Sequence, residues 1–317
     1  GQFVRGGAVQ NVARSMAGLM PVIERHPALR YLAAKDAIME KIILVALGVS
    51  PARNTMDFAC YLAGLTHSKL VGSFAEIAPY ADHPEQKVVF GMPYLEPIVA
   101  GNHPEVVAQQ EAVHRAIQLF RDTCEDRGLP LAIRLQKAPD TDLLLQESRY
   151  ADVLIVDAEA SLTLEKGAAP SPFVKRLLAE AQCPVIIAPV VPQPVEEVVI
   201  CYDGSRAAWF AMKQLAYLFP ELSGARATVL EVIKQGEANL QEKKLITDWL
   251  CRHFAYANYE ALQGDPQDQL TTYLLQKKNA LAVMGAYGRS LLSRFFKQSH
   301  ADGLIQTLAC PVFITHY

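Results

Sequence analysis

One internal repeat constrains the fold of this 317-residue chain more than any other feature. The matching residues lie at a constant offset of 127 positions, and they include Pro139 and Pro266, Leu143 and Leu270, and Cys183-Pro184-Val185 and Cys310-Pro311-Val312. An offset that holds without a gap over about fifty residues indicates two copies of one structural unit. We therefore predict a first copy at residues 39–190 and a second copy at residues 195–317.

Both copies alternate between short apolar runs and longer stretches with helical periodicity. In the second copy the pattern predicts strands at 198–202, 227–233, 259–262, 281–284 and 312–315, and helices at 208–218, 241–256, 268–277 and 299–308. The first copy opens with an apolar run from Ile42 to Leu47, followed by Ser50-Pro51, a pair typical of a helix N-cap and first turn. Strands that alternate with helices predict an α/β fold with two tandem, five-stranded, mostly parallel, doubly wound (Rossmann-like) domains.

Two segments have no counterpart in the second copy. Residues 1–38 form a basic leader whose apolar residues recur at helical spacing, which predicts an amphipathic helix. We interpret this leader either as an added extension or as a native docking helix. Residues 75–105 contain five prolines, and we expect them to form a loop or excursion over the sheet. The join between the copies, residues 189–194, is short and proline-rich, which predicts a stiff linker.

The overall composition argues against several classes of protein. A net charge of -3 and a pI near 6.3 give no general attraction to nucleic acid or to an acidic membrane surface. No apolar run has the length of a membrane span. The six cysteines include no C-x-x-C pair, which favours reduced thiols in a cytoplasmic protein, and the histidines lack metal-ligand spacing. We expect no nucleic-acid partner, no membrane contact and no metal site.

A pair of glycines in the second copy predicts an anion-binding loop. Gly285 and Gly288 follow an apolar strand pattern, and Ser299 opens the next helical pattern. Glycines allow backbone N–H groups to approach phosphate oxygens closely, and a helix N-terminus adds donors and a favourable dipole. Arg289 and the Ser299 hydroxyl would add a charge and a hydrogen bond. The alternative is that the two glycines only form a tight turn after the strand.

This region resembles the universal stress protein family. The resemblance rests on the segment Val283-Met284-Gly285-Ala286-Tyr287-Gly288-Arg289-Ser290, a nine-residue spacer, Ser299, and the closing Cys310-Pro311-Val312. It covers residues 41–317, and it implies five-stranded parallel α/β domains in a tandem pair. One branch of the family binds ATP through G-x-x-G, nine residues, and then G-S or G-T. Gln298 replaces the third glycine of that pattern, so its side chain would lie beside the phosphates.

The resemblance also implies roles for individual residues. Asp203, after the first strand of the second copy, would lie near the ribose or base of a nucleotide. The phosphates would be held by Gly285, Gly288, Arg289, Ser290 and Ser299. The alternative role for Asp203 is local, because Asp203-Gly204-Ser205 is also a good turn and helix cap.

The first copy lacks these features. Gly48 stands where the second copy has Asp203, and the glycine motif is replaced by Ala158, Ser161, Ser171 and Pro172. Pro172 has no N–H to donate, and Asp157 would repel phosphate. We therefore expect no nucleotide in the first copy.

These observations predict a stress-response nucleotide-binding or regulatory protein that takes ATP or AMP, with or without Mg²⁺, in the second copy only. A nucleotide-free interaction scaffold is one alternative, with the leader or residues 75–105 contacting a protein partner. A slow ATPase is another, although the sequence offers neither a dedicated base nor a Walker-type lysine, and we assign no catalytic residue. The resemblance further implies that residues 185–188 and 312–315 pair about a pseudo-twofold axis. A single chain would then resemble a dimer, which leaves a homodimer open.

Overall fold

The computed structural model describes residues 40–76, 85–89, 92–96, 104–137, 139–163, 169–233, 240–285 and 310–315. The chain divides into two units, Gly1–Glu40 and Lys41–Tyr317, and the fold described here is that of the second. The predicted leader, residues 1–38, lies outside the described residues. Since residues 41–317 form one unit, the boundaries of the two copies within it stay a prediction.

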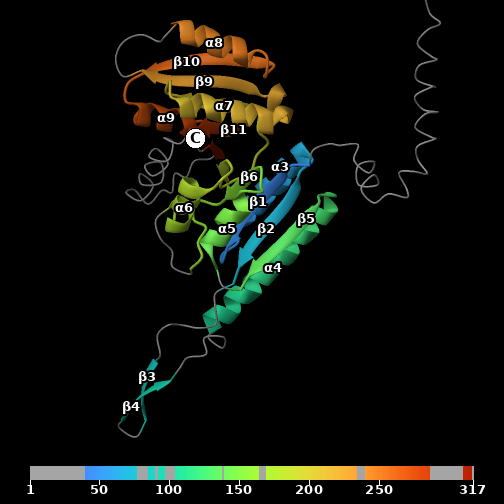
Figure 1. Ribbon diagram of the computed structural model, residues 1–317, viewed down its shortest axis with the longest axis vertical. Coiled ribbons are helices and arrows are strands. Elements are labelled where there is room, and N and C mark those ends of the chain that lie inside the picture. The colour runs from blue at the N-terminus through green and yellow to red at the C-terminus, as the bar shows by residue number, and fades with distance from the viewer. Residues whose placement is uncertain are drawn as a thin grey trace, which may run out of the picture. The chain divides into compact units, whose positions relative to one another are not determined.

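The described part of Lys41–Tyr317 contains a ten-stranded sheet (Figure 1). Its strands are β1 (Ile42–Gly48), β2 (Lys69–Ala75), β5 (Leu131–Gln136), β6 (Val153–Val156), β7 (Val185–Ile187), β8 (Glu197–Tyr202), β9 (Arg226–Ile233), β10 (Tyr256–Gln263), β11 (Ala280–Met284) and β12 (Val312–Ile314). They lie in the order β10-β9-β8-β11-β12-β7-β6-β1-β2-β5. The apolar runs of the inner strands suit this position, because strands covered on both faces lack a polar side.

The sheet consists of two halves with the same internal order. In each half the first strand, β1 or β8, lies between the second and the fourth, and the fifth, β7 or β12, lies next to the fourth. Every pairing within a half is parallel. The halves join where β7 pairs with β12 antiparallel, with Ile186 opposite Phe313. The predicted α/β class with a mostly parallel sheet is confirmed, and the last strands meet as the family resemblance implies.

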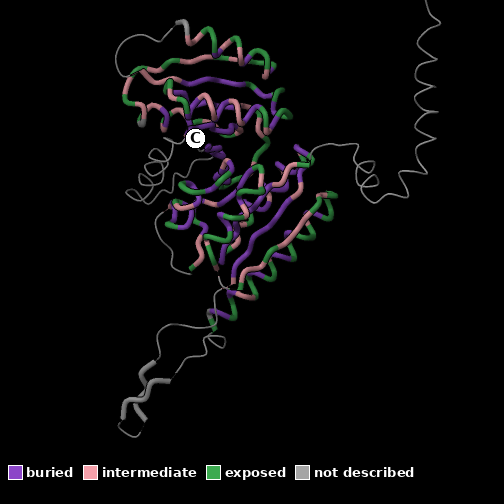
Figure 2. The backbone as a smooth tube through the Cα atoms, viewed as in Figure 1, coloured by how far each residue is buried: buried purple, intermediate pink, exposed green. Residues whose placement is uncertain are grey.

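Helices cover both faces of this sheet. One face carries α3 (Arg53–Thr66), α4 (Pro104–Asp126), α7 (Arg206–Leu218) and α8 (Leu240–Leu250), and the other carries α5 (Thr141–Ser148), α6 (Pro172–Glu180) and α9 (Pro266–Leu275). Successive strand residues alternate between the two cores, so Ile43 packs with the first set of helices and Leu44 with the second. Figure 2 shows the inner strands of the sheet largely buried, the edge strands β5 and β10 less so, and the outer turns of α4 exposed.

Three local predictions need correction. Helix α3 begins at Arg53 rather than at Ser50-Pro51, because Ala52 still has extended backbone angles and acts as an N-cap without a side-chain hydrogen bond. The helix predicted at 241–256 ends at Leu250 and is followed by a turn at 251–253, and Tyr256 already pairs with β9 as the first residue of β10. Residues 75–105 include an antiparallel hairpin of β3 (Glu85–Val89) and β4 (Met92–Glu96).

Two further observations concern the whole described part of the chain. None of its helices combines the length and the apolar character that crossing a membrane requires. The helix predicted at 299–308 falls outside the described residues.

Candidate functional site

The order of the strands in the second half marks one place where a ligand is expected. Strand β8 has β9 on one side and β11 on the other, so the chain leaves β8 in one direction and later returns on its opposite side. Ligands of open α/β sheets bind outside the carboxyl ends of the strands at such a reversal. A pocket with a volume of about 90 Å³ lies at this position, lined by the ends of β8, β9 and β11 and by the first turns of α7 and α9.

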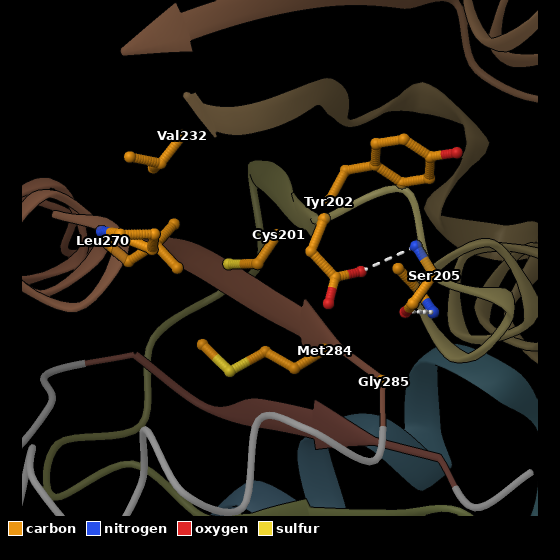
Figure 3. A pocket seen from close by; sticks show the side chains of 10 residues that line it. Cys201, Tyr202, Ser205, Val232, Leu270, Met284 and Gly285 are labelled. Atoms are coloured by element: carbon orange, nitrogen blue, oxygen red, sulfur yellow. Dashed lines mark hydrogen bonds between the residues drawn. The ribbon is translucent and has the colours of Figure 1, made fainter. Parts of the chain in front are cut away.

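The pocket has one apolar and one polar side. Figure 3 shows the side chains of Cys201, Val232, Leu270 and Met284 gathered around a common space, whereas the ring of Tyr202 points away from it. Burial raises the pKa of the Cys201 thiol, which therefore stays protonated and serves as a small apolar group. An apolar wall of this kind suits a flat, weakly polar ring system.

The polar side is built by the turn that leads from β8 into α7. Oδ1 of Asp203 accepts a hydrogen bond of 2.9 Å from the backbone N–H of Ser205, and Oγ of Ser205 accepts one of 3.2 Å from the N–H of Ala208. Gly204 connects them with a φ of 74°, which favours glycine. Ser205 is thus the N-cap of α7, and Asp203 supports the turn, as the capping interpretation predicted. The other carboxylate oxygen of Asp203 has no hydrogen-bond partner that the structure records among the described residues.

Gly285 has a packing reason to be glycine. A Cβ at this position would lie 2.5 Å from the carbonyl carbon of Ala207, in the first turn of α7. The absence of a side chain therefore allows the end of β11 to pack against the start of α7, which brings both into the same pocket. This close approach is independent of any ligand, and it accounts for the first of the two glycines on structural grounds.

Sequence reasoning found part of this site. Asp203 and Gly285 line this pocket, and their predicted contacts with a nucleotide stay a prediction. The remaining candidates lie outside the described residues together with Gln298, namely Gly288, Arg289, Ser290 and Ser299. The apolar wall was missed. Its residues lie at the last or second-last position of three predicted strands and in the first turn of a predicted helix, so the strand ends themselves were the available signal.

Two tyrosines beside the site carry perturbed hydroxyls that the sequence did not suggest. The Tyr202 hydroxyl donates to Glu242 on α8, and the Tyr259 hydroxyl donates to Glu231 on β9. Burial raises the pKa of both phenols, and the neighbouring carboxylates raise it further. Both groups therefore remain protonated hydrogen-bond donors near neutral pH. Within the described residues, no cluster of three or more His, Cys, Asp or Glu side chains is arranged to hold a metal ion.

The corresponding position in the first half is filled by the chain itself. Gly48, at the end of β1, has a φ of 59°, and the next residue, Val49, donates its N–H to the carbonyl of Ser161 over 3.0 Å. Leu162 and Phe173 pack over the strand ends, and the remaining cavity measures about 10 Å³. Ser161 and Leu162 thus occupy the space that is open in the second half.

Comparison with known proteins gives one relative in sequence and several in structure. No model of a known protein family matches the chain. Over 93 residues it is 29% identical to a universal stress protein from Methanocaldococcus jannaschii, a match that spans 29% of this chain and only 52% of that protein.

The structural matches are longer. A universal stress protein from Archaeoglobus fulgidus superposes with a TM-score of 0.59 at 10% identity, covering 88% of this chain and 99% of its own. A functionally unknown protein from Pseudomonas aeruginosa superposes with a TM-score of 0.51 at 12% identity, covering 88% of this chain and 93% of its own. At such low identities the structural matches establish the fold. The chain therefore has a universal stress protein homologue and shares the α/β fold of universal stress proteins.

Proposed function

We propose that this chain is a stress-response protein that binds an adenine nucleotide, ATP or AMP, in its second copy. The observation that carries the proposal is the pocket at the carboxyl ends of β8 and β11, which combines an apolar wall with the Asp203 carboxylate and the capped first turn of α7. The similarity to universal stress proteins supports the same role.

Each part of the pocket suits one part of a nucleotide. The wall of Val232, Leu270 and Met284 would receive the base. Asp203 can accept a hydrogen bond from a ribose hydroxyl with the oxygen that the turn does not use. The phosphates would lie toward the loop after Gly285, where the sequence supplies Gly288, Arg289, Ser290 and Ser299. Mg²⁺, if it accompanies ATP, would be held mainly by the phosphates, since magnesium commonly uses few protein ligands.

The proposal is restricted to the second copy for a steric reason. A cavity of about 10 Å³ in the first half has no room for a nucleotide, whereas the pocket of about 90 Å³ in the second half is already open at its described walls. Opening the first-half position would require the segment at Ser161 to leave its hydrogen bond with Val49.

The test is calorimetric titration of the full chain with ATP and with AMP, each with and without Mg²⁺. We expect one saturable site per chain. Val232→Trp should abolish binding, because the half-buried Val232 borders the pocket and an indole would fill it. Val107→Trp on α4 is the matched control. Val107 is an exposed valine that lines neither the pocket of the second half nor the corresponding cavity of the first half. This variant should bind nucleotide with the affinity of the unaltered chain.

A second pair of variants separates the two roles of Asp203. Asp203→Asn keeps an oxygen for the turn to Ser205 but removes the charge, and we expect it to weaken binding about tenfold while leaving stability unchanged. Asp203→Ala removes both functions and should also lower stability. Equal nucleotide affinity in all three proteins would exclude Asp203 from the binding site. An absence of binding at millimolar ATP and AMP would refute the proposed nucleotide binding.

One observation favours the interaction scaffold as the second candidate. Three large apolar or aromatic side chains are exposed around α7, α8 and β10, namely Tyr217 (61%), Leu245 (64%) and Tyr256 (68%). Exposed groups of this size are common in surfaces that bind proteins. The same titration distinguishes the two functions, because a scaffold without a nucleotide site predicts no saturable heat. Phosphate release measured in the ATP samples tests the slow ATPase alternative.

A further inference from the structure

A second and larger pocket lies in the first half, on the face that α5 covers. It has a volume of about 360 Å³, and it is bordered by β1, β2 and β5 of the sheet and by α5. Cavities of roughly 300–1,000 Å³ are typical of small-molecule sites. Ile42 and Lys69, the first residues of β1 and β2, line it, so it lies toward the amino ends of the strands. The candidate nucleotide site lies at the carboxyl ends of the strands of the other half.

The second copy fills the same position with polar side chains. The strand pairing makes Ile42 equivalent to Glu197, since each opens its strand opposite Lys69 or Arg226. In the second copy Lys277 contacts Glu197 at 2.9 Å, and the Thr228 hydroxyl donates to Glu197 over 3.2 Å.

That network continues across the helix α9. The ring of Tyr273 lies 4.6 Å from the Lys277 ammonium, and its hydroxyl interacts with Lys277 and Glu260. The space beside the strands is thus occupied by a chain of hydrogen bonds and an ion pair.

The first copy has replaced this network by an apolar surface. Ile42 stands for Glu197, and Val71 stands for Thr228 by the same register. The repeat offset places Tyr150 where the second copy has Lys277, and the first copy therefore has no counterpart of the ion pair. What remains is a cavity with Ile42, Leu44, Val71 and Leu143 on its walls.

Three charged side chains line this cavity, the basic Lys69 and Arg134 and the acidic Glu147. Lys69 is partly buried, and the structure records no ion pair for it among the described residues. Arg134 contacts Glu147 at 2.5 Å, but its side chain is 49% exposed and its guanidinium carries further N–H donors. Arg134 stands where the second copy has Glu260, so the sign of the charge is reversed. The neighbouring Asp152 accepts the backbone N–H of Ile42 at 2.7 Å.

We propose that this pocket is a ligand site for a small amphipathic carboxylate. The apolar part of the ligand lies against Leu44, Val71 and Leu143, and its carboxylate meets Lys69 and the outer donors of Arg134. A neutral apolar molecule would leave Lys69 without a partner, and a fully polar anion would not replace the water over the apolar walls. The site is separate from the pocket at β8 and β11, and it does not depend on nucleotide binding.

The test is calorimetric titration of the full chain with octanoate, and with 1-octanol as its neutral counterpart. We expect saturable octanoate binding at one site and weaker binding of octanol. Lys69→Gln should weaken octanoate binding about tenfold, because it removes a charge-assisted hydrogen bond. Arg226→Gln is the matched control, since Arg226 occupies the register position of Lys69 in the second copy, and it should leave the affinity unchanged.

A second variant tests the cavity rather than the charge. Ala132 lines the pocket from β5, and Ala132→Phe should abolish octanoate binding with the far-UV circular dichroism unchanged. If that variant does not fold, the comparison of Lys69→Gln with Arg226→Gln decides. No saturable binding of octanoate, equal loss in those two variants, or octanol binding as tight as that of octanoate would each overturn the proposal.

Discussion

Replacing Gly48 with alanine should destabilise the chain by about 3 kcal/mol, because the added methyl group causes both backbone strain and a steric clash. The φ of 59° at Gly48 is a left-handed conformation, in which a residue with a Cβ costs about 1 kcal/mol. The new Cβ would also lie 2.3 Å from the carbonyl oxygen of Ser161, so that backbone must move. Overpacking of this kind costs about 2 kcal/mol, part of which is the hydrogen bond of 3.0 Å from Val49 to the same carbonyl.

Gly128→Ala is the matched control. Gly128, just after α4, has a φ of 64°, and a Cβ there would meet no atom within 4 Å. It therefore carries the conformational cost alone, about 1 kcal/mol. Urea denaturation followed by circular dichroism measures both variants, and the comparison is valid if the slope of the transition is the same in each. The expected difference between the two variants, about 2 kcal/mol, is the cost of displacing the Ser161 segment.

Equal losses of stability in Gly48→Ala and Gly128→Ala would refute this reasoning. The Ser161 segment would then move away at no cost, and the first half would not be held closed at the position that corresponds to the pocket of the second half. The restriction of nucleotide to the second copy would lose its steric basis. A larger loss in Gly48→Ala combined with nucleotide binding at two sites per chain would contradict that restriction directly.

Three further predictions follow from individual contacts. Lys277→Met should lower the free energy of unfolding by about 1–2 kcal/mol in a urea titration, because it leaves the mostly buried Glu197 carboxylate without its cation. Unchanged stability would show that the pair contributes nothing. Tyr61→Phe should cost about 1 kcal/mol, measured in the same way, since the Tyr61 hydroxyl accepts the N–H of Val195 over 2.9 Å. A thiol reagent should modify one cysteine of the native chain, the exposed Cys251, and all six after unfolding, because the others are buried. Rapid modification of two or more native thiols would contradict the burial of the remaining five.

The sequence predicted the architecture well, because architecture follows from patterns that each copy carries locally. Apolar runs such as Ile42 to Leu47 are typical of strands covered on both faces of a parallel sheet. The internal repeat predicts that both copies adopt the same fold. The antiparallel meeting of β7 and β12 followed from the family resemblance. The end of one helix was predicted too late: the pattern extends to Tyr256, but α8 ends at Leu250, residues 251–253 form a turn, and Tyr256 is the first residue of β10.

The candidate site was only half predictable. Asp203 and Gly285 could be named because turn residues and glycines after a strand are visible in one dimension. The packing of Gly285 against Ala207 could not be predicted, because the two residues lie far apart in the chain and approach each other only once β11 lies beside β8. The apolar wall of the pocket could not be predicted for the same reason, since its residues come from the ends of several different strands and helices.

By itself, the sequence predicted two related α/β copies, and it showed that the second carries Asp203-Gly204-Ser205 and the Gly285 and Gly288 pair whereas the first does not. Those properties depend on the order of residues along the chain. Only the tertiary structure decided that one strand end is open and its counterpart is closed by the Ser161 segment, and that α9 covers an ion pair where α5 covers a cavity. The physical reason is that volumes and ion pairs depend on distances between side chains from different elements, and those distances are set only when the sheet and its two layers of helices pack together.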